Sequence, residues 1–291
     1  MAIRVWLNIY SGRPNPSWEL SDEEGGALLE RIDRLSEATI SKPSGVFGGL
    51  GYRGFLVERS SAAPEGPLSL YIHEGIVDKG QAQINAVDGD QTVERTLLES
   101  GRGRNLIDDG LYKYIAQEMS TRATLGSLLQ GVGIAPAGCP HSQAADAPPY
   151  NPGKWNIPTV QPHNNCYNYG NDHITNTFAQ PGRAHGKPIP SLTCPAAQPS
   201  AIADGLVSVS GFGSPLAPGK GWYVALVIWP GHDYHWYRQD NVGCWSHKPG
   251  QTAARNVDSS GAAISDPRVC NRGPYTDFCG YMVTTRSVVI S

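Results

Sequence analysis

The sequence predicts an α+β protein, with an N-terminal α/β unit and a C-terminal antiparallel sheet that carries a cysteine-bearing helix. Three observations favour this class. The 34 glycines and 23 prolines among 291 residues indicate many turns and ordered loops rather than a helical bundle. Strand and helix periodicities alternate through residues 1–122. A continuous apolar strand and a hairpin pattern follow in the second half.

The first unit begins with a strand, because apolar residues alternate from Ile3 to Ile9. Ser21 and Glu24 have the spacing of a capping box, which predicts a helix from Asp22 onward. Further strands are expected near 54–59 and 68–74, and one or two helices within 95–119. We therefore expect a small α/β domain over residues 1–122.

Residues 123–162 are rich in alanine, proline and glycine. This composition favours a linker or an irregular segment that wraps onto the second half. We expect the second domain to span residues 163–291, and limited proteolysis to cut between the two domains.

The second unit contains a strand and a hairpin. Residues 222–229 are apolar on both faces, which is typical of a central strand. Residues 235–240 and 244–248 flank Asn241-Val242-Gly243, and a three-residue loop that ends in glycine predicts a turn with a bulge. In that register the paired residue numbers add to 484, so His235 and His247 share a face and lie diagonally.

The six cysteines all lie in the second half, at positions 139, 166, 194, 244, 270 and 279. No Cys-x-x-Cys pair occurs, which disfavours a zinc finger. The first residues have no signal-peptide pattern, so we expect a cytoplasmic protein or export without a Sec-type leader, and such a start argues against three disulfides. With Cys166 free, at most two disulfides fit, and Cys270 and Cys279 form the nearest pair.

Composition limits the partners. The net charge is −3, which gives no basic surface for nucleic acid, and no run of 18 apolar residues could cross a membrane. His232, His235 and His247 could together bind zinc, but no suitable carboxylate accompanies them, so we expect no metal and no cofactor. The expected partner is a peptide or amide substrate, and the sequence does not predict the oligomeric state.

Cys166 carries the main chemical hypothesis. It follows Asn164 and Asn165, and asparagine is a strong helix N-cap residue. Cys166, Tyr169, His173 and Ile174 then fall at helical spacing on one face, which predicts a helix that starts at the cysteine. A thiol in a first helical turn is favoured as the reactive thiolate by the helix dipole and by backbone N–H groups.

A cysteine hydrolase also needs a base, an orienting group and an oxyanion donor. We assign the base to His235 and the orienting group to His247, with Asp240 or Asp258 as alternatives. The backbone N–H of Cys166 with the side chain of Asn164 or Asn165 would hold the oxyanion. The competing interpretation is a binding or structural protein, in which Cys166 is a small buried residue or half of a disulfide.

Two resemblances accompany these residues. The order His163-Asn164-Asn165-Cys166, apolar strand, His235 and His247 resembles the Cys-His-His order of papain-like NlpC/P60 and CHAP-type amidases. That likeness implies a papain-like fold and cleavage of peptide or amide bonds, although the family's Asp-Cys-Ser-Gly is here Asn-Cys-Tyr-Asn. Residues 164–169, 177–184 and 245–250 are similar to proteins called insoluble matrix shell protein, a resemblance that implies little mechanism but supplies a non-enzymatic hypothesis.

Overall fold

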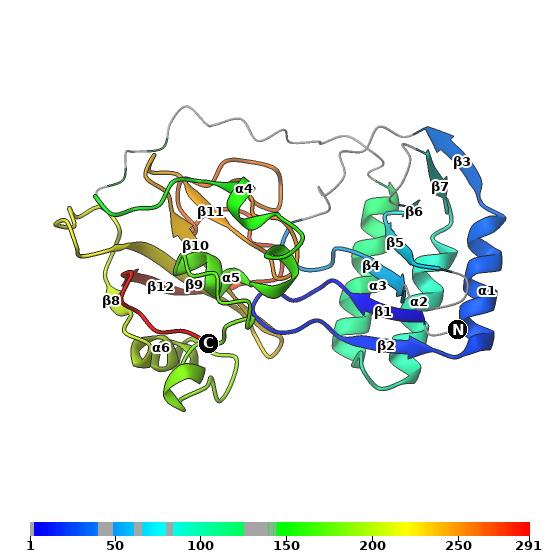
Figure 1. The fold of residues 1–291 in the computed structure, drawn as a ribbon, viewed down its shortest axis with the longest axis horizontal. Coiled ribbons are helices and arrows are strands. Elements are labelled where there is room, and N and C mark those ends of the chain that lie inside the picture. Colours follow the sequence, from blue (N-terminus) through cyan, green and yellow to red (C-terminus); the bar gives the residue numbers. More distant parts are fainter. Residues whose placement is uncertain are drawn as a thin grey trace. The chain divides into compact units, whose positions relative to one another are not determined.

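The protein is described by a computed structural model that covers residues 3–39, 49–60, 66–79, 84–124, 139, 142 and 144–291 (Figure 1). The chain forms two compact units. Unit 1 comprises Met1–Ile9, Asn15–Phe47 and Tyr52–Leu128, and unit 2 comprises Tyr10–Pro14, Gly48–Gly51 and Leu129–Ser291. Both contain helices and an antiparallel sheet, which confirms the predicted α+β class.

Unit 1 is built on a sheet whose described strands follow the order β2-β1-β4-β5-β6-β7-β3. Its elements are β1 (Ile3–Leu7), β2 (Ser17–Leu20), α1 (Asp22–Asp33), β3 (Ser36–Thr39), β4 (Phe55–Arg59), β5 (Leu68–His73), β6 (Ile76–Asp78), β7 (Ile84–Val87), α2 (Thr92–Gly103) and α3 (Asp109–Thr124). The strand pairs described in this unit are all antiparallel.

Local sequence explains how α1 forms and where it packs. The Ser21 side chain accepts a hydrogen bond from Glu24 N, and the Glu24 side chain accepts one from Ser21 N, which confirms the predicted capping box. A Cβ built on Gly25 would lie 3.1 Å from Ile3, so the helix packs closely on the buried face of β1.

Unit 2 contains a sheet whose described strands follow the order β11-β10-β9-β12-β8. Its elements are α4 (Pro152–Trp155), the 3₁₀ helix η1 (Gln161–His163), α5 (Cys166–Gly170), the 3₁₀ helix η2 (Arg183–His185), α6 (Cys194–Ala203), β8 (Val207–Val209), β9 (Trp222–Trp229), β10 (Asp233–Gln239), β11 (Trp245–His247) and β12 (Asp277–Thr284). Figure 1 shows α5 beside β9 and β10.

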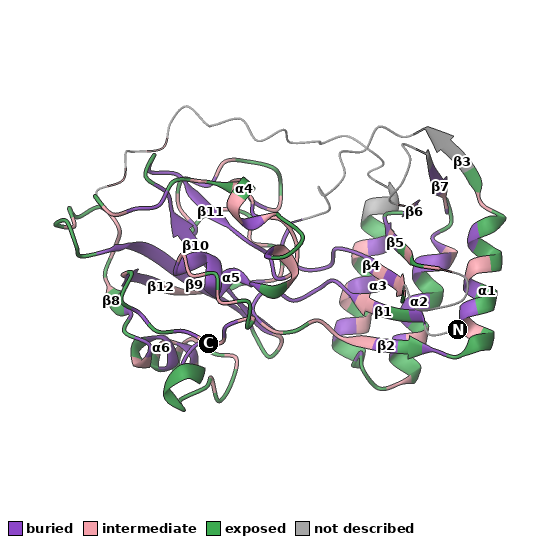
Figure 2. Cartoon of the chain, viewed as in Figure 1, coloured by how far each residue is buried: buried purple, intermediate pink, exposed green. Residues whose placement is uncertain are grey.

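The predicted strand and hairpin of unit 2 are confirmed. Every residue of β9 is buried, and β9 lies in the middle of the sheet (Figure 2). In the β10–β11 hairpin, Tyr237 pairs with His247 and Gln239 with Trp245, the register in which paired numbers add to 484. Gly243 has φ +87°, the left-handed conformation that a bulge after this turn requires.

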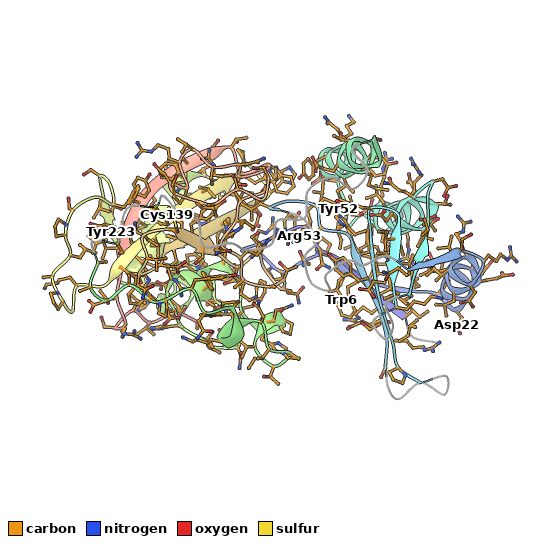
Figure 3. The ribbon with its side chains drawn as sticks, turned by 90° about the horizontal axis from the view of Figure 1, so that it is seen from above. Trp6, Asp22, Tyr52, Arg53, Cys139 and Tyr223 are labelled. Carbon is orange, nitrogen blue, oxygen red and sulfur yellow. A yellow bond between two sulfur atoms is a disulfide. The ribbon has the colours of Figure 1, made fainter. Side chains whose placement is uncertain are left out.

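Two disulfides brace unit 2. Cys139 is bonded to Cys244 (Figure 3), and Cys194 is bonded to Cys279. Cys270 and Cys279, the nearest pair in the sequence, are not bonded to each other, because Cys279 lies on β12 against α6, where Cys194 opens the helix. Cys166 and Cys270 are free thiols.

The segment expected as a linker, 123–162, is described only in part by the structure. Residues 125–138, 140, 141 and 143 lie outside the described residues. Residues 144–162 belong to unit 2, where Trp155 and Val160 form a buried cluster with Tyr169 and Ala254. The proline-rich composition there makes an ordered, irregular wrap and the short helix α4, rather than a spacer.

No helix among the described residues is both long enough and apolar enough to span a bilayer.

Candidate functional site

Cys166 is the first residue of α5, as the sequence predicted. The Asn165 side chain accepts hydrogen bonds from Tyr167 N and Asn168 N. In return, the Asn168 side-chain oxygen accepts a hydrogen bond from Asn165 N. The helix is shorter than expected. It ends at Gly170, and Asp172 has φ +53°, so His173 and Ile174 do not extend it. A helix of this length has only a small macrodipole to favour a thiolate.

The surroundings of the Cys166 sulfur are those of a packed residue. Cys166 is 0% exposed, and its Sγ lies 4.0 Å from the Tyr234 carbonyl oxygen, its hydrogen-bond acceptor. Burial raises the pKa of the thiol well above its ordinary value, and the nearby Asp233 charge raises it further. The protonated, inert form of the thiol is therefore favoured.

The two histidines predicted to act together do lie together. His235 Nε2 is 2.8 Å from His247 Nδ1, and His247 Nε2 is 3.0 Å from the Val257 carbonyl oxygen. The His247 ring also stacks on Tyr237, with centroids 5.0 Å apart. The second histidine is thus held in place by the backbone and by an aromatic ring.

The Cys166–His235 hydrogen bond of the predicted dyad is not formed. The Trp236 ring packs on Tyr167 of α5, at 5.3 Å between centroids. Since successive side chains of a strand point to opposite faces, His235 points away from the face that α5 covers. The structure joins His235 to His247 and gives the Cys166 thiol the Tyr234 carbonyl instead.

Asn164 and Asn165, the predicted oxyanion donors, use their amide protons elsewhere. Asn164 Nδ2 donates to Val160 O at 2.8 Å and to Asn176 Oδ1 at 2.7 Å. Asn165 Nδ2 donates to Gly12 O at 2.9 Å and to Ala179 O at 2.7 Å. A side-chain amide has two protons, so both groups are structural in this conformation.

The alternative orienting carboxylates are also engaged elsewhere. Asp240 forms an ion pair with Arg238, at 3.0 Å. Asp258 accepts hydrogen bonds from Ser260 N and Ala262 N within its own turn.

The third histidine of the possible zinc site, His232, contacts the Trp229 ring at 4.6 Å between centroids. Within the described parts of the chain, no cluster of three His, Cys, Asp or Glu side chains could hold a metal ion.

The sequence did not predict how the segment Tyr10–Pro14 binds within unit 2. The buried Asp233 carboxylate accepts hydrogen bonds from the backbone N–H groups of Ser11, Gly12 and Arg13 and from the Tyr275 hydroxyl. The Gly12 carbonyl accepts one from Gln180 Nε2, at 2.8 Å, besides that from Asn165. Burial raises the pKa of Asp233, and these donors oppose that shift. The only signal in the sequence is the Ser11-Gly12-Arg13-Pro14 turn.

A lysine that the sequence analysis did not identify as important stabilises the loop that leads into α5. Lys248 is fully buried, and its Nζ donates to the carbonyls of Gln161, Asn164 and Gly250, at 2.6, 2.5 and 2.6 Å. The ammonium therefore fixes the backbone immediately before the Asn165 cap. In the sequence, a lysine next to Pro249 and Gly250 is typical of an exposed turn, so its burial and its contacts with carbonyls were not predicted.

Comparison with known proteins matches the second of the two resemblances. Insoluble matrix shell protein 1 from Ruditapes philippinarum is 50% identical over 133 residues, which are 46% of this chain and 87% of that protein. No family model matches the chain, so a papain-like family gains no support. No solved structure matches it either. On the identity and coverage of that relative, this chain belongs to the family of insoluble matrix shell protein 1.

Proposed function

We propose that this chain is a non-enzymatic structural protein of a matrix, stabilised by disulfides. One observation carries the proposal: the Cys166 thiol is buried, donates a hydrogen bond to a backbone carbonyl, and has a raised pKa. Buried structural cysteines of this kind are inert. The name of the matrix relative points in the same direction.

The disulfides support the same proposal. Four of the six cysteines form Cys139–Cys244 and Cys194–Cys279. Disulfides persist in oxidising surroundings, and a matrix outside the reducing cytosol is such a place. Of the two locations expected from the sequence, we therefore propose export over the cytoplasm.

Replacing Cys166 by alanine tests the proposal. A packed thiol predicts that Cys166→Ala lowers the free energy of unfolding of unit 2 by on the order of 1 kcal/mol, because a cavity remains. Denaturation followed by tryptophan fluorescence reports mainly on unit 2, which holds five of the seven tryptophans.

Cys270→Ala is the matched control, because Cys270 is the other free thiol and is less buried. Its loss of stability should be smaller than that of Cys166→Ala. A Cys166→Ala protein at least as stable as the wild type would count against the structural proposal.

A cysteine hydrolase is the second candidate, and the 2.8 Å contact between His235 and His247 favours it. In this function Cys166 would attack an amide carbonyl after a rearrangement that brings the thiol to His235. A peptide vinyl sulfone should then modify Cys166 at neutral pH, and His235→Ala should abolish the modification. Absence of modification in the native protein would reject this candidate.

A further inference from the structure

Strand β8 ends the sheet of unit 2 on one side. It pairs with β12, with Val209 opposite Tyr281 and Val207 opposite Val283. Among the described residues, no other strand or bridge pairs with β8. The opposite end of the sheet differs, because bridges to Ile264 and Arg255 cover β11. The outer edge of β8 therefore presents backbone groups for pairing.

The side chains of β8 are apolar or hydroxylic, and two of the three are exposed, while Val209 is half-buried. Val207 is 60% exposed, and Ser208 and Ser210 are also exposed. From Gly205 to Gly219 the chain has no charged residue, and no proline occurs before Pro215. Native proteins protect an edge strand by keeping it very short, or with lysine, proline or a bulge; β8 is short, at three residues, but has none of the other three devices within Val207–Val209.

The edge is also held in place before any partner binds. Cys194, the first residue of α6, is bonded to Cys279 of β12. Helix α6 packs against both β8 and β12. A preformed edge loses less conformational entropy on binding than a mobile segment would.

We propose that β8 is a self-association site that pairs antiparallel with β8 of a second copy of this chain. A strand that pairs with itself places each side chain near its own kind, so any charge would meet a like charge. The uncharged β8 avoids this repulsion. Pairing centred on Ser208 would set Val207 opposite Val209 of the partner copy and join the two sheets edge to edge.

This inference rests on the proposed matrix function for its biological meaning, because a matrix protein must associate. The edge is only three residues long, so we expect weak pairing that requires high protein concentration. Its test does not involve Cys166, so its failure and that of the proposed function are distinguishable.

The experiment compares sedimentation equilibrium of the wild-type full chain with that of Ser208→Lys. The wild-type mass should rise toward twice the monomer mass with concentration. In the variant two ammonium groups would face each other, and the dimer dissociation constant should increase by at least about tenfold. Ser191→Lys is the matched control, since Ser191 is exposed and lies outside the sheet, and it should associate like the wild type.

A charge swap tests the register. Ser208→Glu alone should also weaken association, whereas an equimolar mixture of Ser208→Lys and Ser208→Glu should restore it, because opposite charges then meet at the centre. Circular dichroism checks that each variant is folded. A wild type that stays monomeric at its solubility limit, Ser208 variants that associate like the wild type, or a mixture that fails to associate would each overturn the proposed pairing.

Discussion

At the residue scale, Gly12 shows how one absent side chain permits a buried contact. A Cβ on Gly12 would lie 2.3 Å from the Tyr234 ring, closer than real Cβ atoms approach. Gly12 also bonds to Asp233 through its N–H and to Asn165 and Gln180 through its carbonyl. The binding of the segment Tyr10–Pro14 therefore depends on glycine at this position.

We expect Gly12→Ala to lower the free energy of unfolding of unit 2 by about 1–3 kcal/mol, as overpacking does in other cores. Gly213→Ala is the matched control, because a Cβ added at Gly213 would have no atom within 4 Å and the backbone conformation there suits alanine. Urea denaturation measures both variants. Equal stability of the two would show that the Tyr234 ring moves aside at no cost.

Asp240 provides a pH-dependent test. Burial raises its pKa from 3.8 to about 6, although Arg238 opposes the shift. The folded state thus binds this proton more tightly than the unfolded state, so the associated stability is complete below about pH 4 and is lost as pH rises through 6. The wild type should lose up to about 3 kcal/mol relative to Asp240→Asn across this window. Parallel stability curves of the two proteins between pH 4 and 7 would contradict the assignment.

At the residue scale, the sequence predicted what local rules determine. The caps at Ser21 and Asn165 depend on neighbours within three residues. The carboxylate of Asp233 instead bonds to Ser11 N, 222 positions away, and the Cys166 thiol bonds to a carbonyl 68 positions away. No local pattern encodes such contacts, so the sequence pairs the thiol with a histidine rather than with the Tyr234 carbonyl.

At the element scale, the loop that leads into α5, residues 161–165, stabilises this five-residue helix more than the helix stabilises itself. Three backbone carbonyls around the entry share the Lys248 ammonium. The sequence predicted where α5 begins because asparagine caps are specific, and it overestimated where α5 ends because helical spacing continued by chance to Ile174. The β10–β11 register was predictable because Gly243 fixes the turn.

Lys248→Met should therefore destabilise unit 2 by about 2–5 kcal/mol, since it leaves buried carbonyls without their donor. Lys220→Met is the control, because Lys220 is exposed, and its effect should stay within about 0.5 kcal/mol. Thermal denaturation compares the two. If both variants melt together, the ammonium does not support the α5 entry.

At the scale of the whole molecule, the two disulfides close long loops. Cys194–Cys279 spans 85 residues and Cys139–Cys244 spans 105. Pairing of this kind could not be read from spacing, because sheet order rather than sequence distance brings Cys194 to β12. The fold class was predictable from composition and periodicity, whereas the strand order of either sheet was not.

The double variant Cys194→Ser/Cys279→Ser should lose about 2–5 kcal/mol of stability, as expected for removal of a native disulfide. Cys270→Ser removes a free thiol and should lose less. Guanidinium denaturation without reductant measures both proteins. If the double variant is as stable as Cys270→Ser, the bridge does not brace the sheet.

The central claim is that Cys166 is a packed, protonated thiol rather than a nucleophile. The most direct measurement is the rate of iodoacetamide alkylation of Cys166 in the native protein from pH 6 to 9, followed by peptide mass spectrometry. Burial raises the pKa of Cys270 to about 11, so this half-buried thiol serves as an internal reference. The account predicts that Cys166 reacts more slowly than Cys270 at every pH and reacts freely only after denaturation. Fast alkylation of native Cys166 at pH 6–7, slowed by His235→Ala, would contradict it.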